Sequence, residues 1–354
     1  MTTAWCYLYC SEQHIVVLVW REMTEESSTT SPLSFMTQIT GGMTSSFSRG
    51  NEFYFQCGVL VIGVLGTAAN ALILYALVAS KQHKKHLLIV HQNVLDLFTS
   101  FFMIITYSLL LCNLYLTGPA GYWLCALLLS ESCIWWGTLG SVVNLAIITI
   151  ERYLKVVHSS WSQNKLRNWM TYSAMAFAWI ISFVTNVAVA FPTSAVIDGA
   201  CHSYAIWPSN TFRVINFLWN FLAFYVIVII IFVFCYWRIL IVICRQARVM
   251  ATHAAAGPST TQAHAQAQYN QIQSNVIKTM IFLSAFYAIS WLPSYVYYLY
   301  LNISPRPHFT EIGYYASVSI AYLYMCTNPF VYATKFDPVK EVLLRLIHCK
   351  KISE

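Results

Sequence analysis

The stretch LLIVHQNVLDLFTSFFMIITYSLLL, residues 87–111, decides the class of fold, because Asp96 is its only charged residue among largely apolar side chains. About 20 consecutive apolar residues are enough for a helix to cross the hydrocarbon core of a bilayer. The stretch therefore predicts a transmembrane helix.

Six further stretches have the same character, namely 55–80, 123–153, 169–191, 212–244, 275–301 and 309–333. Of the 354 residues, 58% are apolar and only 9% are charged, against about 25% charged in a soluble domain. The sequence predicts an all-α membrane protein, a seven-transmembrane helix bundle followed by a short amphipathic C-terminal helix. The net charge of +7 lies in short runs between the spans, which indicates membrane topology and not a nucleic-acid partner.

The distribution of Lys and Arg predicts the orientation of the chain. The loops after the first, third and fifth spans and the C-terminal segment hold most basic residues, among them Lys81, Lys155, Arg245 and Lys350. Because basic loops remain in the cytosol, we expect an extracellular N-terminus, a cytoplasmic C-terminus and a multi-pass protein of the plasma membrane. The sequon at Asn302 then falls on the outer side and is a candidate glycosylation site.

Three regions follow from this topology. Residues 1–54 form an extracellular, largely disordered segment, 55–333 the seven-transmembrane domain, and 334–354 a cytoplasmic amphipathic helix that contacts membrane lipid, with a short tail. Residues 1–22 are either part of the mature chain or absent from it, through signal-peptide cleavage or a start at Met23. Cys349 is a palmitoylation candidate, although an ordinary cytosolic thiol fits it equally well.

Polar residues inside the spans mark candidate sites, because such residues are costly in lipid. Asp96 could meet Ser141 and Asn328 and hold a small cation through oxygen ligands. The alternative is a neutral, hydrogen-bonded Asp96 that holds helices together. Cys125 and Cys201 both face the oxidising outer side, which favours a disulfide between them.

Two further features are a charged triplet at the membrane border and prolines inside two of the spans. Glu151, Arg152 and Tyr153 stand at the inner end of the third span, where an acid–arginine pair can act as a switch or merely extend to the interface. Pro293, beside Trp291, and Pro329, beside Asn328, each remove a backbone hydrogen bond and kink a helix.

These motifs occur together and in order, and the chain from about 55 to 347 resembles the class A, rhodopsin-like G-protein-coupled receptors. The matching residues are Gly66, Asn70, Asp96, Cys125, Glu151, Arg152, Tyr153, Trp179, Trp291, Leu292, Pro293, Asn328, Pro329, Phe330, Val331 and Tyr332. The resemblance implies a receptor, not an enzyme, that transmits binding of an extracellular ligand to a heterotrimeric G protein when helix 6 moves outward. Arrestin is a further partner that the resemblance suggests.

The resemblance also implies residue roles. Arg152 resembles the arginine that engages the G protein, and Glu151 its resting partner. Trp291 resembles the toggle aromatic beneath the ligand pocket. Asp96, Ser141 and Asn328 resemble an allosteric sodium site, so the metal candidate is Asp96. Tyr332 and Tyr236 resemble the water-linked pair of the active state.

Three departures from the family pattern stand out. The fifth span has no proline, and the distance from Cys125 to Arg152 is about two residues longer than usual. Gln273 stands where many relatives carry an acid that pairs with the arginine. We therefore expect appreciable basal signalling.

The ligand is narrowed by exclusion to a peptide or a small organic molecule. The outer third span reads Ile134, Trp135 and Trp136 where aminergic receptors carry an aspartate, and the seventh span has no lysine that could bind a retinal cofactor. The candidates for the ligand pocket are Glu131, Trp135, Trp136, Tyr295, Tyr298, Tyr314 and Tyr315. Glu131 could meet a cationic ligand or play a structural role, and some of the aromatic residues could anchor helices at the interface.

Two other functions remain open from the spans alone. A transporter or channel would need charged pore-lining residues or repeated halves, and neither is apparent in the sequence. A receptor-like scaffold without signalling is disfavoured by the intact Arg152 and Asn328.

Overall fold

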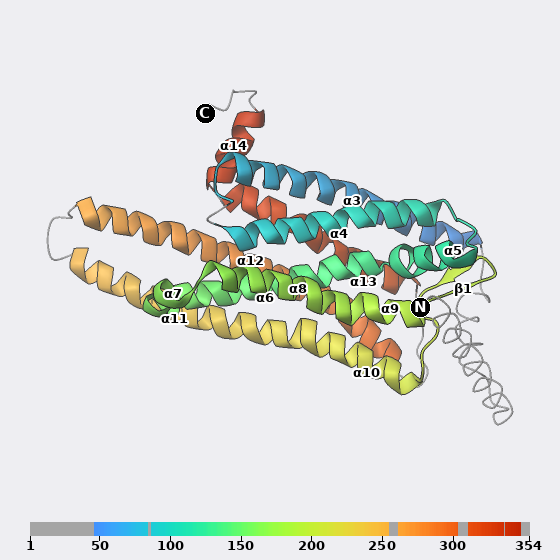
Figure 1. The fold of residues 1–354 in the computed structure, drawn as a ribbon. Coiled ribbons are helices and arrows are strands. Elements are labelled where there is room, and N and C mark those ends of the chain that lie inside the picture. The colour runs from blue at the N-terminus through green and yellow to red at the C-terminus, as the bar shows by residue number, and fades with distance from the viewer. Residues whose placement is uncertain (1–45, 84–85, 255–260, 304–310, 336, 348–354) are drawn as a thin grey trace, which may run out of the picture. The chain divides into compact units, whose positions relative to one another are not determined.

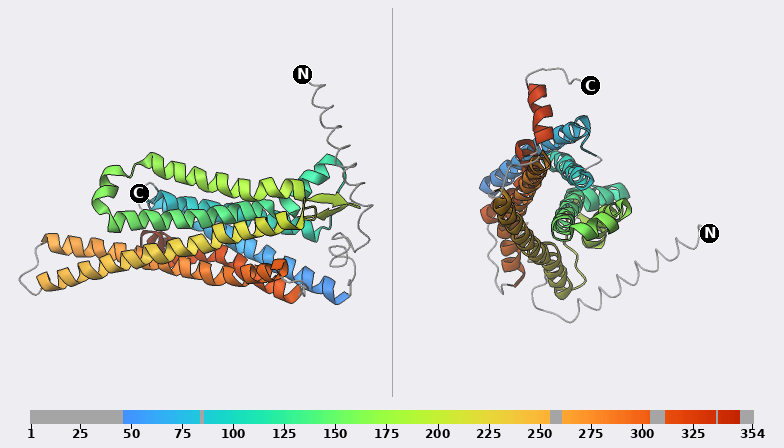
Figure 2. Two further views of the ribbon diagram at one scale, coloured as in Figure 1. Left: turned by 90° about the horizontal axis from the view of Figure 1, so that it is seen from below. Right: turned by 90° about the vertical axis from the view of Figure 1, so that its left-hand side faces the viewer.

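The computed structural model describes residues 46–83, 86–254, 261–303, 311–335 and 337–347. Residues 1–50 and 51–354 form two units, and the helix bundle belongs to the second. Its long helices run side by side (Figure 1). Two views at right angles show the same bundle from below and from one end (Figure 2).

Seven spans are built from helices with the following bounds. They are α3 (Ser46–Ala79), α4 (Leu87–Leu111), α5 with η1 and α6 (Gly118–Leu124, Cys125–Leu129, Ser132–Val157), α8 with η2 and α9 (Asn168–Ser182, Phe183–Val187, Ala188–Thr193), α10 with η3 and α11 (Asn210–Phe221, Leu222–Val226, Ile227–Ala254), α12 (Thr261–Ile303) and α13 (Glu311–Lys335). The short α7 (Ser159–Lys165) lies between the third and fourth spans. The predicted seven-helix bundle is confirmed.

Six of the described spans are long and apolar enough to cross a membrane, and α13 is the seventh helix of the bundle. Large apolar side chains such as Val61, Ile230, Val233 and Phe282 are exposed on the outside of the bundle. An exposed apolar surface of this kind suits contact with lipid tails and not with water.

The interior of the bundle contains both apolar and small side chains. The central α6 packs against α4, α8 and α11. Its Leu145 and Ile148 are fully buried. Gly137 on α6 allows α4 to approach closely, because a Cβ at this position would lie 2.3 Å from Oγ1 of Thr99.

Three spans contain a π-helical turn, which adds a residue to a turn and often marks a functional position. In the fifth span, η3 (Leu222–Val226) is a π-turn in a span that has no proline. The expected continuous third span is interrupted, because η1 is followed by Ser130 and by Glu131, which has a left-handed backbone (φ 60°).

A hairpin of β1 (Ala195–Ile197) and β2 (Ala200–His202) lies between the fourth and fifth spans, with Val196 paired to Cys201. Cys201 forms the predicted disulfide with Cys125 at a Cα–Cα distance of 5.3 Å. The hairpin is thereby fixed to η1 at the outer end of the third span.

The predicted amphipathic helix after the last span is present as α14 (Asp337–Ile347). Val339 and Val342 are buried against the bundle, whereas Lys340 and Glu341 are exposed. Cys349 lies outside the described residues.

Candidate functional site

A buried polar network surrounds Asp96 in the middle of the bundle. Oγ of Ser141 donates to Oδ1 of Asp96 at 2.6 Å, and Nδ2 of Asn328 donates to Oδ2 at 2.6 Å. All three side chains are fully buried. The predicted cluster of Asp96, Ser141 and Asn328 therefore forms and connects α4, α6 and α13.

Gln92 is a fourth member of this network that sequence reasoning missed. Its Nε2 donates to Oδ1 of Asp96 at 3.5 Å and also to Oγ of Ser141. Its Oε1 accepts from Nδ2 of Asn144 at 2.8 Å, and Oδ1 of Asn144 lies 2.8 Å from Nδ1 of His91. Gln92 could have been found from its spacing, because residues four apart share one face of a helix.

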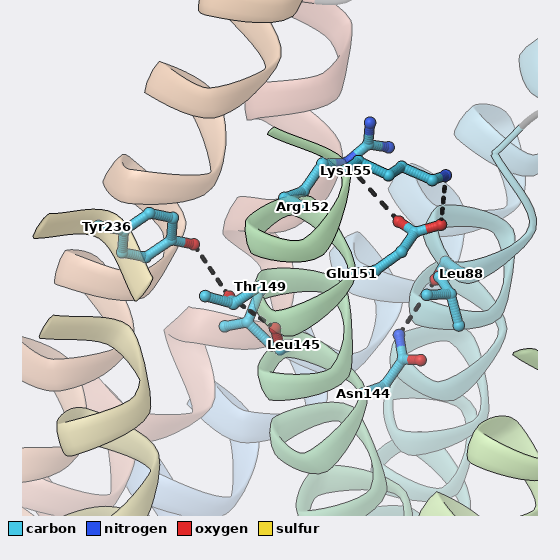
Figure 3. A network of polar contacts seen from close by, with 8 residues as sticks. All are labelled: Leu88, Asn144, Leu145, Thr149, Glu151, Arg152, Lys155 and Tyr236. Carbon is cyan, nitrogen blue, oxygen red and sulfur yellow. Dashed lines mark hydrogen bonds and ion pairs between the residues drawn. The ribbon is translucent and has the colours of Figure 1, made fainter. Parts of the chain in front are cut away.

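The charged residues at the inner end of α6 form a small cluster (Figure 3). Nε of Arg152 lies 3.7 Å from Oε2 of Glu151, while Nζ of Lys155 lies 2.6 Å from Oε1 of the same carboxylate. The side chain of Arg152 is only 8% exposed, and its Nε has no hydrogen-bond partner among the described residues. Glu151 therefore holds Lys155 closely and Arg152 only loosely, and Lys155 is a partner that the sequence analysis did not name.

Tyr236 of α11 joins two other helices, and Figure 3 shows its contact with Thr149 beside the charged cluster. Its hydroxyl lies 3.0 Å from Oγ1 of Thr149 on α6 and 3.0 Å from Oγ of Ser284 on α12. The side chains of Gln273 and Tyr332, which were expected near this region, lie outside the described residues, so the expected pairing of Tyr236 with Tyr332 stays a prediction. Tyr153 packs its ring against Phe234 at 5.7 Å and lies 3.2 Å from His158.

Trp291 lies in the buried aromatic centre of the bundle. Its side chain is 2% exposed, and its ring lies 5.8 Å from Trp135 and 6.0 Å from Tyr295. Pro293 follows it within the continuous α12, and Pro329 lies within α13. Trp135 and Tyr295, two pocket candidates, are therefore in contact with the predicted toggle residue.

The other pocket candidates divide into two groups. Tyr298 and Tyr314 lie edge to face at 6.2 Å, and Tyr315 stacks on Phe55 at 4.5 Å, so these three join the outer ends of α12, α13 and α3. Trp136 lies apart from them, because its Nε1 donates to the carbonyl of Trp179 at 3.0 Å in an aromatic cluster with the fourth span.

Glu131 receives hydrogen bonds from two other helices at the break in the third span. The hydroxyl of Tyr107 on α4 donates to Oε1 at 2.5 Å, and the hydroxyl of Tyr322 on α13 donates to Oε2 at 2.7 Å. Both tyrosines are almost completely buried. Sequence reasoning named Glu131 but neither tyrosine partner.

Tyr204, in the loop after the hairpin, lies within electrostatic reach of Glu131. Burial raises the pKa of Tyr204 to about 12, and the negative charge of Glu131 acts in the same direction, against a hydrogen bond from Ser132 that lowers it. The Tyr204 hydroxyl donates to Oδ1 of Asn186 at 2.9 Å. The loop therefore connects the fourth span to the vicinity of Glu131.

The bundle has seven helices around a buried polar network, and the third helix carries a buried arginine at one end. This combination is typical of a seven-transmembrane receptor. The family model described as 7 transmembrane receptor (rhodopsin family) matches residues 69–332. The chain belongs to this family, whose members are receptors and not enzymes.

Relatives with known names agree with this assignment. The chain is 21% identical over 309 residues to the galanin receptor type 1 of Rattus norvegicus, covering 84% of the chain and 82% of that receptor. It is 22% identical to the somatostatin receptor type 1 of Rattus norvegicus, covering 86% and 74%. A match to the bombesin receptor subtype-3 of Ovis aries, at 26% identity, covers 54% of the chain and about half, 49%, of that receptor.

A solved structure shows the same fold. The crystal structure of squid rhodopsin superposes with a TM-score of 0.68 at 17% identity, covering 85% of this chain and 88% of that chain.

Proposed function

We propose that the protein transmits binding of an extracellular ligand to a heterotrimeric G protein through outward movement of the inner half of α12. The observation that carries the proposal is the arrangement at Arg152. The arginine is buried at the inner end of α6 and lies only 3.7 Å from a carboxylate that already binds Lys155 at 2.6 Å. A buried arginine with a weak partner can exchange that partner for a group on a G protein at small energetic cost.

The contacts of Tyr236 support the movement of α12. Its hydroxyl lies between Thr149 and Ser284, so α6, α11 and α12 share one small polar junction. Displacement of α12 must break the contact with Ser284 and frees the Tyr236 hydroxyl for another partner, for which Tyr332 is the candidate. A single neutral hydrogen bond contributes about 0.5–1.5 kcal/mol, which a ligand with differential affinity for two states can supply.

A ligand screen in cells that report cAMP and calcium tests this function. The receptor and Arg152→Ala are compared at matched surface expression, with Arg345→Ala as the control because Arg345 is a cation on α14 whose partner is Glu341. We expect responses that vanish in Arg152→Ala and persist in Arg345→Ala. Responses that survive Arg152→Ala unchanged would contradict the proposed role of Arg152.

The receptor is proposed to act at the plasma membrane with its N-terminus outside. The basic loops on one side, and the disulfide and the sequon at Asn302 on the other, support this orientation. The relatives are named as receptors for galanin, somatostatin and bombesin, which favours a peptide over a small organic molecule. Antibody access to an N-terminal epitope on intact cells tests the orientation.

The polar network around Asp96 is proposed to hold a sodium ion only after its hydrogen bonds rearrange. Asp96 and Ser141 offer oxygen ligands of the kind that Na⁺ prefers, and so does the side-chain oxygen of Asn328, which has no hydrogen-bond partner among the described residues. However, N–H donors from Gln92 and Asn328 occupy the two carboxylate oxygens. A cation would have to displace at least the Gln92 amide. Arrestin binding, palmitoylation of Cys349 and glycosylation of Asn302 remain predictions.

A further inference from the structure

The carboxylate of Glu131 is a negative group at the outer end of the bundle without a positive partner in the part of the chain that the structure describes. The described ion pairs join Glu151 to Arg152 and Lys155, and Glu341 to Arg345. The partners of Glu131 are neutral hydroxyl groups. An ionised carboxylate that is partly removed from water is stabilised most by a cation, and no described residue supplies one to Glu131.

The geometry leaves the carboxylate able to accept further donors. Each oxygen accepts one bond, at 2.5 Å from Tyr107 and at 2.7 Å from Tyr322. An ionised carboxylate has about four lone-pair sites, so roughly two remain free. The two tyrosines hold the carboxylate in a fixed position between α4 and α13, which prepares it for a ligand without further ordering.

The backbone at this position supports a recognition role rather than packing alone. Glu131 is the one non-glycine residue inside a described span that adopts a positive φ, at 60°. Ser130 and Ser132 on either side both donate to the carbonyl of Ala126, at 2.7 and 2.9 Å, and hold the break in place. A left-handed conformation of a non-glycine residue is unfavourable, and such residues concentrate at functional sites.

Aromatic rings lie beside the carboxylate's tyrosine partners. The ring of Trp135 lies 6.3 Å from Tyr322, and Phe55 lies 6.0 Å from Tyr107. Electron-rich ring faces attract ammonium and guanidinium groups in addition to the attraction of a carboxylate. A neutral donor group gains only a hydrogen bond from this combination, and an anionic group is repelled by the carboxylate.

We propose that Glu131, held by Tyr107 and Tyr322, is the recognition site for a cationic group of the ligand, an ammonium or a guanidinium. The proposal rests on the proposed function as a ligand-binding receptor and adds the chemical class of the group that binds. The alternative role of Glu131, a purely structural connection of the third span to α4 and α13, is an outcome of the test.

The site has a direct route to the centre of the bundle. Tyr322 contacts Trp135, and Trp135 contacts Trp291 at 5.8 Å. A cation bound to the Glu131 carboxylate would weaken the hydrogen bond from Tyr322 and thereby alter the packing around Trp291. Binding of a charged ligand group would then affect Tyr322 and Trp135, which connect Glu131 to Trp291 on α12.

Thermal unfolding of the purified full-length receptor tests the proposal without any G protein. The probes are 2-phenylethylamine and benzylguanidine, with 2-phenylethanol as the neutral isostere, each at about 10 mM so that weak binding becomes visible as stabilisation. We expect both cations to raise the Tm by about 2–4 °C and the alcohol to leave it unchanged.

The variants separate recognition from structure. Glu131→Gln keeps one acceptor oxygen for a tyrosine hydroxyl, can donate its amide N–H to the other tyrosine, and removes the charge, so we expect it to abolish the shift caused by the cations. Glu52→Gln is the matched control, because Glu52 is an exposed acid on α3, and it should keep the full shift. If Glu131→Gln does not fold, Glu131→Asp retains the charge on a shorter side chain and should weaken the apparent affinity at least several-fold.

Several results would overturn the proposal. They are no shift in the wild-type receptor with either cation, an equal shift in Glu131→Gln, or an unchanged affinity in Glu131→Asp. Failure of the proposed signalling function would appear differently, as an absence of G-protein responses in cells while the shift caused by the cations is retained.

Discussion

The hydroxyl of Tyr236 on α11 lies 3.0 Å from the hydroxyl of Ser284 on α12. This hydrogen bond joins the fifth span to α12, the helix that is proposed to move. It lies on the inner half of the bundle, on the same side of Trp291 as Arg152. Ser284 can therefore be changed without touching Arg152 or the outer end of the receptor.

Ser284→Ala should raise ligand-independent signalling. The substitution removes the tie to Tyr236 and leaves Tyr236 its contact with Thr149. Loss of one hydrogen bond of about 0.5–1.5 kcal/mol shifts a two-state equilibrium about 2- to 10-fold. Basal cAMP or calcium signals at matched surface expression measure the effect. Ser290→Ala is the control, because among the described residues its hydroxyl bonds within α12, to the carbonyls of Phe286 and Tyr287. Equal basal signals in both variants would speak against the tie.

Gln92→Leu should make the receptor more sensitive to sodium. The substitution removes the amide that donates to Asp96 and Ser141, so that Oδ1 of Asp96 keeps only the donor from Ser141 and can also accept a cation. The measurement is the Tm of the purified receptor in sodium chloride against N-methylglucamine chloride at equal ionic strength. We expect a larger sodium effect in Gln92→Leu than in the wild type. Asn93→Ala is the control, because Asn93 donates to the carbonyl of Ile89 on its own helix. The same sodium effect in all three proteins would refute the competition between Gln92 and the ion.

Gly137→Ala should destabilise the bundle. The added Cβ would lie 2.3 Å from Oγ1 of Thr99 and 2.8 Å from Cδ1 of Phe98, so α4 and α6 would have to move apart. Overpacking of this kind typically costs about 1–3 kcal/mol. Gly58→Ala is the matched control, because nothing lies within 4 Å of its added Cβ. We expect a lower Tm and lower surface expression for Gly137→Ala only, and equal stability of the two variants would contradict the close approach of α4 to α6.

Cys201→Ser should lower the stability of the outer side of the receptor. The disulfide with Cys125 closes a loop with a sequence separation of 76, and loss of a native disulfide costs about 2–4 kcal/mol. Thermal unfolding and surface expression measure the loss. Cys112→Ser is the control, because Cys112 is an exposed free cysteine. A Cys201→Ser receptor as stable as Cys112→Ser would mean that the bond contributes little.

The spans could be predicted from the sequence because the bilayer imposes a simple length and composition. The predicted span 87–111 coincides with α4, and the predicted fourth and seventh spans agree with their helices within two residues at each end. The helices of the other spans run further than predicted, because α3 begins at Ser46, α11 ends at Ala254 and α12 begins at Thr261. The Asp96 cluster was also predictable, since a buried carboxylate in lipid requires polar partners. Gln92 was missed because a neutral amide costs less in lipid than a charge, although its position four residues before Asp96 placed it on the same helix face.

The break at Glu131 could not be predicted from local sequence. It contains no proline or glycine, the residues that usually mark a helix interruption. Its left-handed backbone depends on two tyrosines from distant spans and on the flanking serines, and these contacts are set by tertiary structure. The different surroundings of Trp135 and Trp136 follow from helix geometry, because adjacent residues point about 100° apart. The sequence does not say which of these two tryptophans contacts Trp291, because that depends on how α12 packs against α6.

The break in the third span separates two helical segments, η1 (Cys125–Leu129) and α6 (Ser132–Val157). The resemblance to the rhodopsin-like receptors implies that Cys125 and Arg152 are about two residues further apart than usual, and the π-turn with Ser130 and Glu131 lies between them. An insertion at this break would leave the helical register from Ser132 inward unchanged. Alignments with other receptors should therefore be anchored on Arg152 for the inner segment and on Cys125 for the outer one, and positions between the two anchors should not be equated across the family by simple counting.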